Sequence, residues 1–244
     1  SLDTLERIST DEVSRIARRE TANVVERLRG IEALTEVLRR EAARALSTPR
    51  APPPDERAAY ALLEDGRFVT TRDYGGGALF YSGRVPIGEA QREKAYRSGR
   101  LDPVLEAVVR ASPAVVQTYI NTWDSMNRIY PYLDAAEQFP AGLDISEFNF
   151  YYEADATHNP DRGVVWTDAY LDPAGQGWIV SSLAPVYIDG ALEAVAGIDV
   201  TLDDVIEHVL DLDLPWDGYG FLVAEDGTAI PLPRAAEADL GLTE

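Results

Sequence analysis

Cysteine is absent from this 244-residue chain, so disulfides, thiolate-bound metals and cysteine nucleophiles are excluded. Histidine is scarce, and because His158 and His208 lie far apart in different sequence contexts, a histidine-based catalytic triad or zinc site is not expected. Basic residues are also few, 22 against 42 acidic ones, and the formal net charge is -20. A field of that sign repels nucleic-acid phosphates and anionic lipid surfaces. We therefore expect neither of these as a binding partner.

Long hydrophobic runs are missing as well. No apolar stretch approaches the roughly 20 residues that a membrane-spanning helix needs. No signal peptide is visible, the sequence begins at Ser1, and its single methionine is Met126. These features together predict an excised fragment of a larger protein.

The common catalytic signatures are absent from the sequence, which has no P-loop, no glycine-rich dinucleotide fingerprint and no HExxH motif. Asp211, Asp213 and Asp217 superficially resemble a calcium loop, but the residues between them do not match the required ligand pattern. Acidic residues are so abundant that no particular pair can be assigned to glycoside hydrolysis. We predict no catalytic activity, no metal and no cofactor, with a carboxylate-dependent hydrolase as the weaker alternative.

Residues 2–47 are predicted to form one long helix. Its apolar positions recur at mostly three- and four-residue steps: Leu5, Ile8, Val13, Ile16, Val24, Leu28, Ile31, Leu34 and Leu38. The following sequence STPRAPPP ends the helix because consecutive prolines cannot continue it. A helix this long exceeds ordinary globular length. It either packs along its own domain or pairs with a second copy, and both interpretations remain open.

The rest of the chain predicts an antiparallel sheet with short helices. Strands are predicted over 67–71, 78–81, 115–122, 128–132, 164–170, 178–187 and 191–200, and helices over 55–63, 87–110 and 148–156. The sequence WDSMN is the predicted turn between the third and fourth strands, and Asp189-Gly190 is a strong hairpin signal. Thr201 is the predicted N-cap of a helix reaching about Leu210, and a further hairpin is predicted over 219–231. Hairpin-connected strands flanked by helices indicate the α+β class.

Aromatic residues are concentrated between Tyr119 and Tyr170. Tyrosine and tryptophan carry polar groups that need partners when buried, so several are expected to border a partly wet cavity. Asp199 ends an apolar strand, where a carboxylate also needs a partner. Aromatic rings beside a carboxylate suit the binding of an organic cation. An aromatic-rich core and a strand-end acid near the helix start at Thr201 are the alternatives.

Four stretches carry a family resemblance: YINTWDSMNRIYPY, FYYEADATHNP, VVWTDAYLDPAG and WIVSSLAPVYIDGALEAVAGIDVTL. With the long N-terminal helix, they resemble the extracytoplasmic double Cache (PAS-like) sensor domains of bacterial and archaeal histidine kinases, chemoreceptors and cyclases. The resemblance implies a long helix over 1–48, a membrane-distal PAS-like ligand-binding module over 49–210, and the incomplete start of a membrane-proximal module over 211–244. It also implies the periplasmic part of an inner-membrane receptor, with a sensor histidine kinase as the expected type. Such a receptor would be a homodimer attached to the membrane through flanking segments.

The same resemblance implies which residues bind a small-molecule ligand. The family's pocket aspartate corresponds to Asp199, its later tyrosine to Tyr170, and its Trp-Tyr pair to Phe150-Tyr151. Phe148 stands where amino-acid-binding members carry an arginine for the ligand carboxylate, which argues against an ordinary α-amino acid and for an amine. The full predicted ligand-binding set is Tyr119, Tyr130, Tyr151, Tyr152, Trp166, Tyr170 and Asp199. The alternative is a ligand-independent dimerisation module whose cavity is filled by its own side chains.

Overall fold

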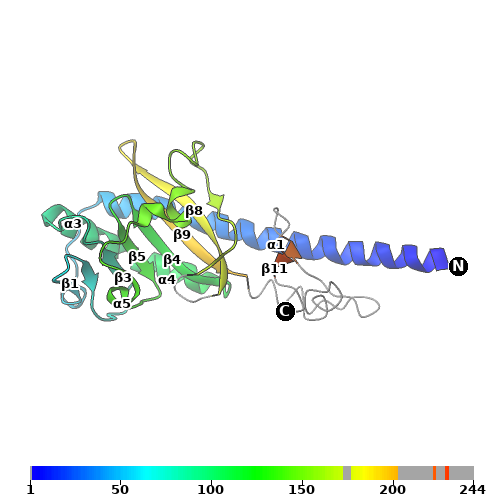
Figure 1. Ribbon diagram of the computed structural model, residues 1–244, viewed down its shortest axis with the longest axis horizontal. Coiled ribbons are helices and arrows are strands. Elements are labelled where there is room, and N and C mark those ends of the chain that lie inside the picture. The colour runs from blue at the N-terminus through cyan, green and yellow to red at the C-terminus, as the bar shows by residue number, and fades with distance from the viewer. Residues whose placement is uncertain (1, 173–176, 203–221, 224–228, 231–244) are drawn as a thin grey trace. The chain divides into compact units, whose positions relative to one another are not determined.

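The computed structural model describes residues 2–172, 177–202, 222–223 and 229–230 (Figure 1). Residues 31–201 form one compact unit, and the described residues outside that range belong to a second unit. The larger unit combines helices with an antiparallel sheet, which confirms the predicted α+β class.

Within the described residues, nine strands form one sheet in the order β1-β2-β3-β5-β4-β9-β8-β6, and β7 also pairs with β8. The strands are β1 (Tyr60–Leu62), β2 (Phe68–Thr70), β3 (Ala78–Tyr81), β4 (Val115–Thr122), β5 (Met126–Tyr130), β6 (Val165–Trp166), β7 (Tyr170–Leu171), β8 (Trp178–Ile188) and β9 (Ala191–Thr201). The predicted Asp189-Gly190 hairpin joins the two longest strands, β8 and β9. Both turn residues have positive φ, 50° and 83°, as a tight hairpin turn of this kind requires.

Helix α1 (Leu2–Ser47) confirms the predicted long helix. Its C-terminal part lies along one face of the sheet, called here the helix face (Figure 1). Ile31, Leu38 and Ala42 of this part are buried in a core cluster with residues of β4 and β9. Helices α3 (Glu89–Ser98) and α4 (Asp102–Ala111) contribute to the same cluster. The helix face is thus the larger apolar core of the unit.

On the opposite face of the sheet, called here the cavity face, the helices among the described residues are short. These are α5 (Ala135–Gln138), the 3-10 turn η2 (Ile145–Glu147) and α6 (Asn149–Tyr152). A second core cluster joins them to the sheet and includes Phe80, Tyr119 and Ile129. Short helices cover a strand face incompletely, and this face is where the cavity described below lies.

Two local predictions are wrong. Residues 60–62, predicted as helix, form β1 because a turn with Gly66 at φ 88° brings Leu62 opposite Phe68. Asn127, predicted in a turn, belongs to β5, since a tighter turn with Ser125 at φ 60° leaves more residues for pairing. Thr201 is the last residue of β9 and pairs with Ile179, and its predicted role as an N-cap stays a prediction. The predicted helix from there to Leu210 lies outside the described residues.

A third prediction, the single strand over 164–170, is only partly right, because β6 and β7 are separate strands along the same partner β8. In the second unit, β10 (Leu222–Val223) pairs antiparallel with β11 (Ala229–Ile230), within the hairpin predicted over 219–231. The rest of the predicted membrane-proximal module lies outside the described residues. None of the described helices combines the length and the apolar character needed to cross a membrane.

Candidate ligand-binding site

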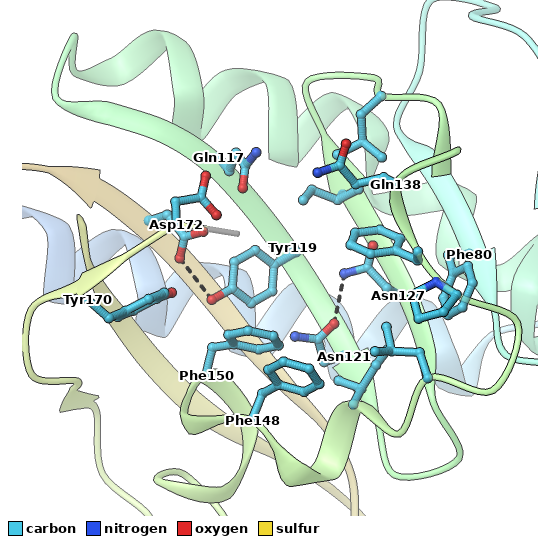
Figure 2. A pocket seen from close by; sticks show the side chains of 17 residues that line it. Phe80, Gln117, Tyr119, Asn121, Asn127, Gln138, Phe148, Phe150, Tyr170 and Asp172 are labelled. Carbon is cyan, nitrogen blue, oxygen red and sulfur yellow. Dashed lines mark hydrogen bonds between the residues drawn. The ribbon is translucent and has the colours of Figure 1, made fainter. Parts of the chain in front are cut away.

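A cavity of about 270 Å³ lies on the cavity face of the sheet (Figure 2). Its lining side chains are Phe80, Gln117, Tyr119, Asn121, Asn127, Ile129, Leu133, Gln138, Phe139, Pro140, Leu143, Ile145, Phe148, Phe150, Tyr170, Asp172 and Asp199. Such a volume is near the lower end for small-molecule sites. The cavity therefore suits a small organic molecule rather than a polymer.

Strand alternation explains which residues reach the cavity. On β4, Gln117, Tyr119 and Asn121 line the cavity, whereas Thr118 and Ile120 face the helices: Thr118 donates a hydrogen bond to a carbonyl of α4, and Ile120 is in the core of the helix face. Successive strand residues point to opposite faces of a sheet. The sequence QTYIN thus supplies three cavity residues from one strand.

Asp199 is held at one end of the cavity by two hydroxyl groups. Tyr119 Oη and Ser181 Oγ both donate to its Oδ1 atom, at 2.9 and 2.7 Å, and Tyr170 Oη lies 2.7 Å from Ser181 Oγ. Burial of the carboxyl group raises the pKa of Asp199 to about 7, aided by the charge of Asp172, although the two hydroxyl donors oppose the rise. Near neutral pH, this carboxyl group can therefore either hold a proton or exchange it for a bound cation.

Asp172 brings a second carboxyl group to the same cavity. It follows β7, is only 8% exposed, and lies near enough to Asp199 to act on its pKa. By contrast, the lining residues, all in the described part of the chain, include no lysine, arginine or histidine. The cavity is therefore polar and acidic at this end, with no cation to receive a ligand carboxylate.

Aromatic rings form a wall next to the acidic end (Figure 2). The rings of Phe148 and Phe150 are stacked, with centroids 5.0 Å apart and an interplanar angle of 15°. Phe150 also meets Tyr119 edge to face at 6.2 Å. Ring faces attract cations and apolar chains alike. The wall can therefore hold the body of a ligand whose charged group reaches Asp199.

Amide side chains line the other end of the cavity. Asn127 Nδ2 donates to Asn121 Oδ1 at 2.7 Å, across the β4–β5 pair, and Figure 2 shows this bond away from Asp172 and Tyr170. Gln138 lines the cavity too, whereas Gln117 is the strand partner of Asp199 and lies beside Asp172 at the acidic end (Figure 2). The two ends of the cavity thus differ in chemistry, one acidic and one amide.

The predicted site residues divide into three groups. Tyr119, Tyr170 and Asp199 line the cavity together. Tyr130 and Trp166 pack against the core of the helix face, where Trp166 donates a 2.9 Å hydrogen bond to Glu32 of α1. Their strand neighbours Ile129 and Val165 take the cavity side instead. The placement of these two aromatic side chains does not fit the predicted role in ligand contact, because the pleat turns them away from the cavity.

The remaining two predicted residues lie on the cavity side without lining the cavity. Tyr151 is 5% exposed and packs in the core cluster of the cavity face. Tyr152 points elsewhere and contacts the ring of His158, with centroids 5.3 Å apart. Both belong to α6, the short helix that also places Phe150 in the cavity. Neither tyrosine is among the residues that line the cavity.

Several lining residues were missed by the sequence reasoning. Asp172 lies two positions after Tyr170, the spacing that places residues on one side of an extended chain, so this signal was available. Gln117 and Asn121 likewise flank Tyr119 at two-residue steps. Asn127 was not recognised as a cavity residue because the sequence pattern predicts a turn for its segment. Gln138 comes from a segment with no periodicity that indicates a cavity.

Comparison with known proteins gives a consistent picture of the fold. No protein-family model matches the sequence. The methyl-accepting chemotaxis protein PscA of Pseudomonas syringae pv. tomato is 36% identical over 72 residues, which are 29% of this chain and 11% of PscA. The matched segment thus spans about a tenth of that protein.

Solved structures resemble almost the whole chain. The ligand-binding domain of the Pseudomonas aeruginosa amino acid chemoreceptor PctC, in complex with GABA, has a TM-score of 0.58 and 20% identity, covering 92% of this chain and 75% of that one. The ligand-binding domain of the Pseudomonas fluorescens chemoreceptor CtaA, in complex with L-isoleucine, has a TM-score of 0.56 and 18% identity, covering 96% and 73%. At such identities the likeness shows the fold alone. The fold is that of the Cache-like ligand-binding domains of chemoreceptors.

Proposed function

We propose that this chain is the extracytoplasmic ligand-sensing domain of a transmembrane signalling receptor, and that it binds an organic amine without a carboxylate group. The observation that carries the ligand class is the charge of the cavity, which has two buried carboxyl groups and no basic lining residue. The ammonium group of the ligand would pair with Asp199, and the apolar part of the ligand would lie against Phe148 and Phe150. An α-amino acid would bring a carboxylate into the same acidic cavity without a bidentate partner.

The comparisons also support a proposal about the type of receptor. The structural likeness to chemoreceptor domains and the partial match to a chemotaxis protein favour a chemoreceptor over the histidine kinase expected from the sequence. Periplasmic location, membrane attachment through flanking segments and pairing as a homodimer are parts of the same proposal. The domain itself would have no catalytic activity.

Adjacent residues of β8 offer a route from the cavity to α1. Ser181 donates to Asp199 on the cavity face, and Ser182, the next residue, is hydrogen-bonded to Thr35 of α1 at 2.8 Å. A ligand that shifts Asp199 would move Ser181 of β8. Because Ser182 is the next residue, its hydrogen bond to Thr35 would pass that movement to α1. The ligand must bind one arrangement of β8 and α1 better than the other for a signal to result.

Matched pairs of amines and their parent amino acids test the ligand class. We expect phenethylamine, isoamylamine or agmatine to bind at least about 100-fold more tightly than phenylalanine, leucine or arginine, since each pair differs only in the carboxylate. Isothermal titration calorimetry on the purified domain, after a thermal-shift screen, measures the difference. Equal or tighter binding of the amino acids would contradict the proposed ligand class.

Gly197 of β9 tests the geometry around Asp199. A Cβ atom at this position would collide with the ring of Tyr119, so replacing Gly197 with alanine should displace the ring and break its hydrogen bond to Asp199. We expect the affinity of Gly197→Ala for a bound amine to fall about tenfold. Gly163→Ala is the control, because a Cβ there meets no atom within 4 Å. An unchanged affinity in Gly197→Ala would show that Tyr119 has no part in binding.

The two alternative functions have less support. A module filled by its own side chains is disfavoured, because a cavity borders Asp199. A hydrolase with two carboxylates gains some support from Asp172 and Asp199, which share the cavity. However, the cavity is small, and the related folds belong to ligand-binding domains. Incubation with chromogenic glycosides, with Asp199→Asn as control, tests this candidate directly.

A further inference from the structure

A bulge in β4 places Gln117 directly opposite Asp199. Val115 pairs with Val200 of β9 and Gln117 pairs with Asp199, so β4 has one residue more than β9 in this interval. In a regular strand, residues two apart face the same side of the sheet. Here Val115 lies in the core of the helix face, whereas Gln117 lines the cavity. The bulge thus turns Gln117 toward the cavity, and such re-aimed side chains are frequent next to functional sites.

The amide group of Gln117 forms no hydrogen bond with another described residue, although the residue is only 6% exposed. The surrounding protein does not fully enclose either amide atom. Since Gln117 lines the cavity, its accessible amide opens into that cavity. Polar groups this deeply buried in native structures are nearly always paired, so the amide points to a ligand or a water as its partner. Such a partner can accept from the N–H groups or donate to the oxygen.

Gln117 and Asp199 present an amide and a carboxyl group side by side, with Asp172 next to Gln117 (Figure 2). Side chains directly opposite each other on one face of a sheet have Cβ atoms about 5 Å apart. One small ligand can therefore touch both with polar groups on neighbouring carbon atoms. Its second group must form hydrogen bonds, because an apolar atom would displace water and leave the amide unpaired. It must also be neutral, because the two carboxyl groups repel a carboxylate.

We propose that Gln117 is a specificity-determining residue that selects amines with a neutral hydrogen-bonding group on the carbon next to the one that carries the ammonium group. This inference rests on the proposed function, because it assumes that the ligand's ammonium group pairs with Asp199. The ligand class is thus a vicinal amino alcohol or an α-amino amide. The hydroxyl or amide group of the ligand meets the amide of Gln117, and the apolar part of the ligand lies against Phe148 and Phe150.

A matched pair of ligands tests the inference. Leucinol and 1,3-dimethylbutylamine carry the same charge and differ only in one hydroxyl group. In isothermal titration calorimetry on the purified protein, we expect leucinol to bind about tenfold more tightly. In Gln117→Met, which keeps the length of the side chain without its amide, the ratio of the two affinities should fall to about one. In Gln117→Glu, which keeps a hydrogen-bonding oxygen, leucinol should remain the tighter ligand.

The outcomes separate this inference from the proposed function. If neither isoamylamine nor any other amine binds, the proposed function fails, and the role of Gln117 fails with it. If isoamylamine binds but leucinol is no tighter than its matched amine, or if Gln117→Met keeps the tenfold ratio, only the role of Gln117 is overturned. The comparison within the unaltered protein and the Gln117→Glu variant keep the test valid even if Gln117→Met does not fold, and circular dichroism checks the folding of each variant.

Discussion

Replacing Asp199 with asparagine is expected to weaken the binding of an amine at least about 100-fold, which is about 2.7 kcal/mol. Asparagine keeps the shape of the side chain and can still accept from Tyr119 and Ser181, which both bond to Oδ1 in the unaltered domain. The substitution therefore removes the negative charge and little else. Tyr119 and the aromatic wall would remain to hold the apolar part of the ligand.

The pH dependence of binding provides a second measure of the same group. Because the pKa of Asp199 is raised to about 7, the empty domain holds a proton there below that pH, and an ammonium ligand must displace it. Affinity should rise with pH, by up to about tenfold per unit, and level off above pH 7. In Asp199→Asn the profile should be flat over this range. A flat profile in the unaltered domain, or equal affinities of the two proteins, would demote Asp199 to a structural role.

The same raised pKa predicts how the stability of the empty domain changes with pH. A carboxyl group that keeps its proton in the folded state contributes stability that is fully present below its unfolded pKa of about 4. That contribution is lost as pH rises from about 4 to about 7, and its total is on the order of 4 kcal/mol. The stability of Asp199→Asn relative to the unaltered domain should therefore increase over this window. Urea denaturation at several pH values measures the difference.

The residues of the site show which cavity residues can be predicted from sequence patterns and which cannot. Asp199 and Tyr170 were found because they stand in motifs, GIDV and WTDAY, whose resemblance to a family assigns them a place. Tyr130 and Trp166 share the aromatic chemistry of Tyr119, yet they face α1. Residue type does not reveal the face, because a shift of one residue along a strand reverses it. Cross-strand register decides it, and register depends on turns such as that at Ser125.

The architecture was more accessible than the site. Long periodic segments such as α1, and the β8–β9 hairpin with Asp189-Gly190 at its turn, follow from local patterns. Asn127 and Gln138 could not be recognised in this way, since each enters the cavity only through tertiary packing. The absence of a basic lining residue is likewise a property of the assembled cavity. A sequence can suggest it at one position, as at Phe148, but cannot exclude a cation supplied by another strand.

Replacing Arg128 with methionine is expected to destabilise the domain by about 3–5 kcal/mol. Arg128 lies in β5 between Asn127 and Ile129, which face the cavity, and its own side chain is fully buried on the helix face. The guanidinium group donates to both carboxylate oxygens of Asp102, with Nε at 2.8 Å from Oδ1, and to Tyr60 Oη at 2.7 Å. It also donates to Tyr74 Oη. Arg128 thus joins Asp102, Tyr60 and Tyr74 in one buried network, which Tyr60 extends to the Arg50–Glu56 ion pair.

The large loss of stability arises because the substitution leaves the Asp102 carboxylate without its partner. Without the guanidinium group, the Asp102 carboxylate, only 13% exposed, loses its cation and its bidentate hydrogen bonds. A buried charge without a partner costs much more than the net contribution of the pair. Arg110→Met is the matched control, because Arg110 is 74% exposed and makes one ion pair with Glu106 on the same helix, so its loss should change stability by less than about 0.5 kcal/mol.

A double variant separates the buried pair from simple loss of packing. Arg128→Met with Asp102→Leu removes both charges, and apolar replacement of a buried pair is often neutral, so it should recover much of the stability lost in the single variant. Urea denaturation monitored by tryptophan fluorescence measures all three proteins. If Arg128→Met loses less than about 1 kcal/mol, the network does not hold β5 in place. If the loss is large, β5 is fixed from behind by Arg128, and Asn127 is thereby presented to the cavity on a rigid strand.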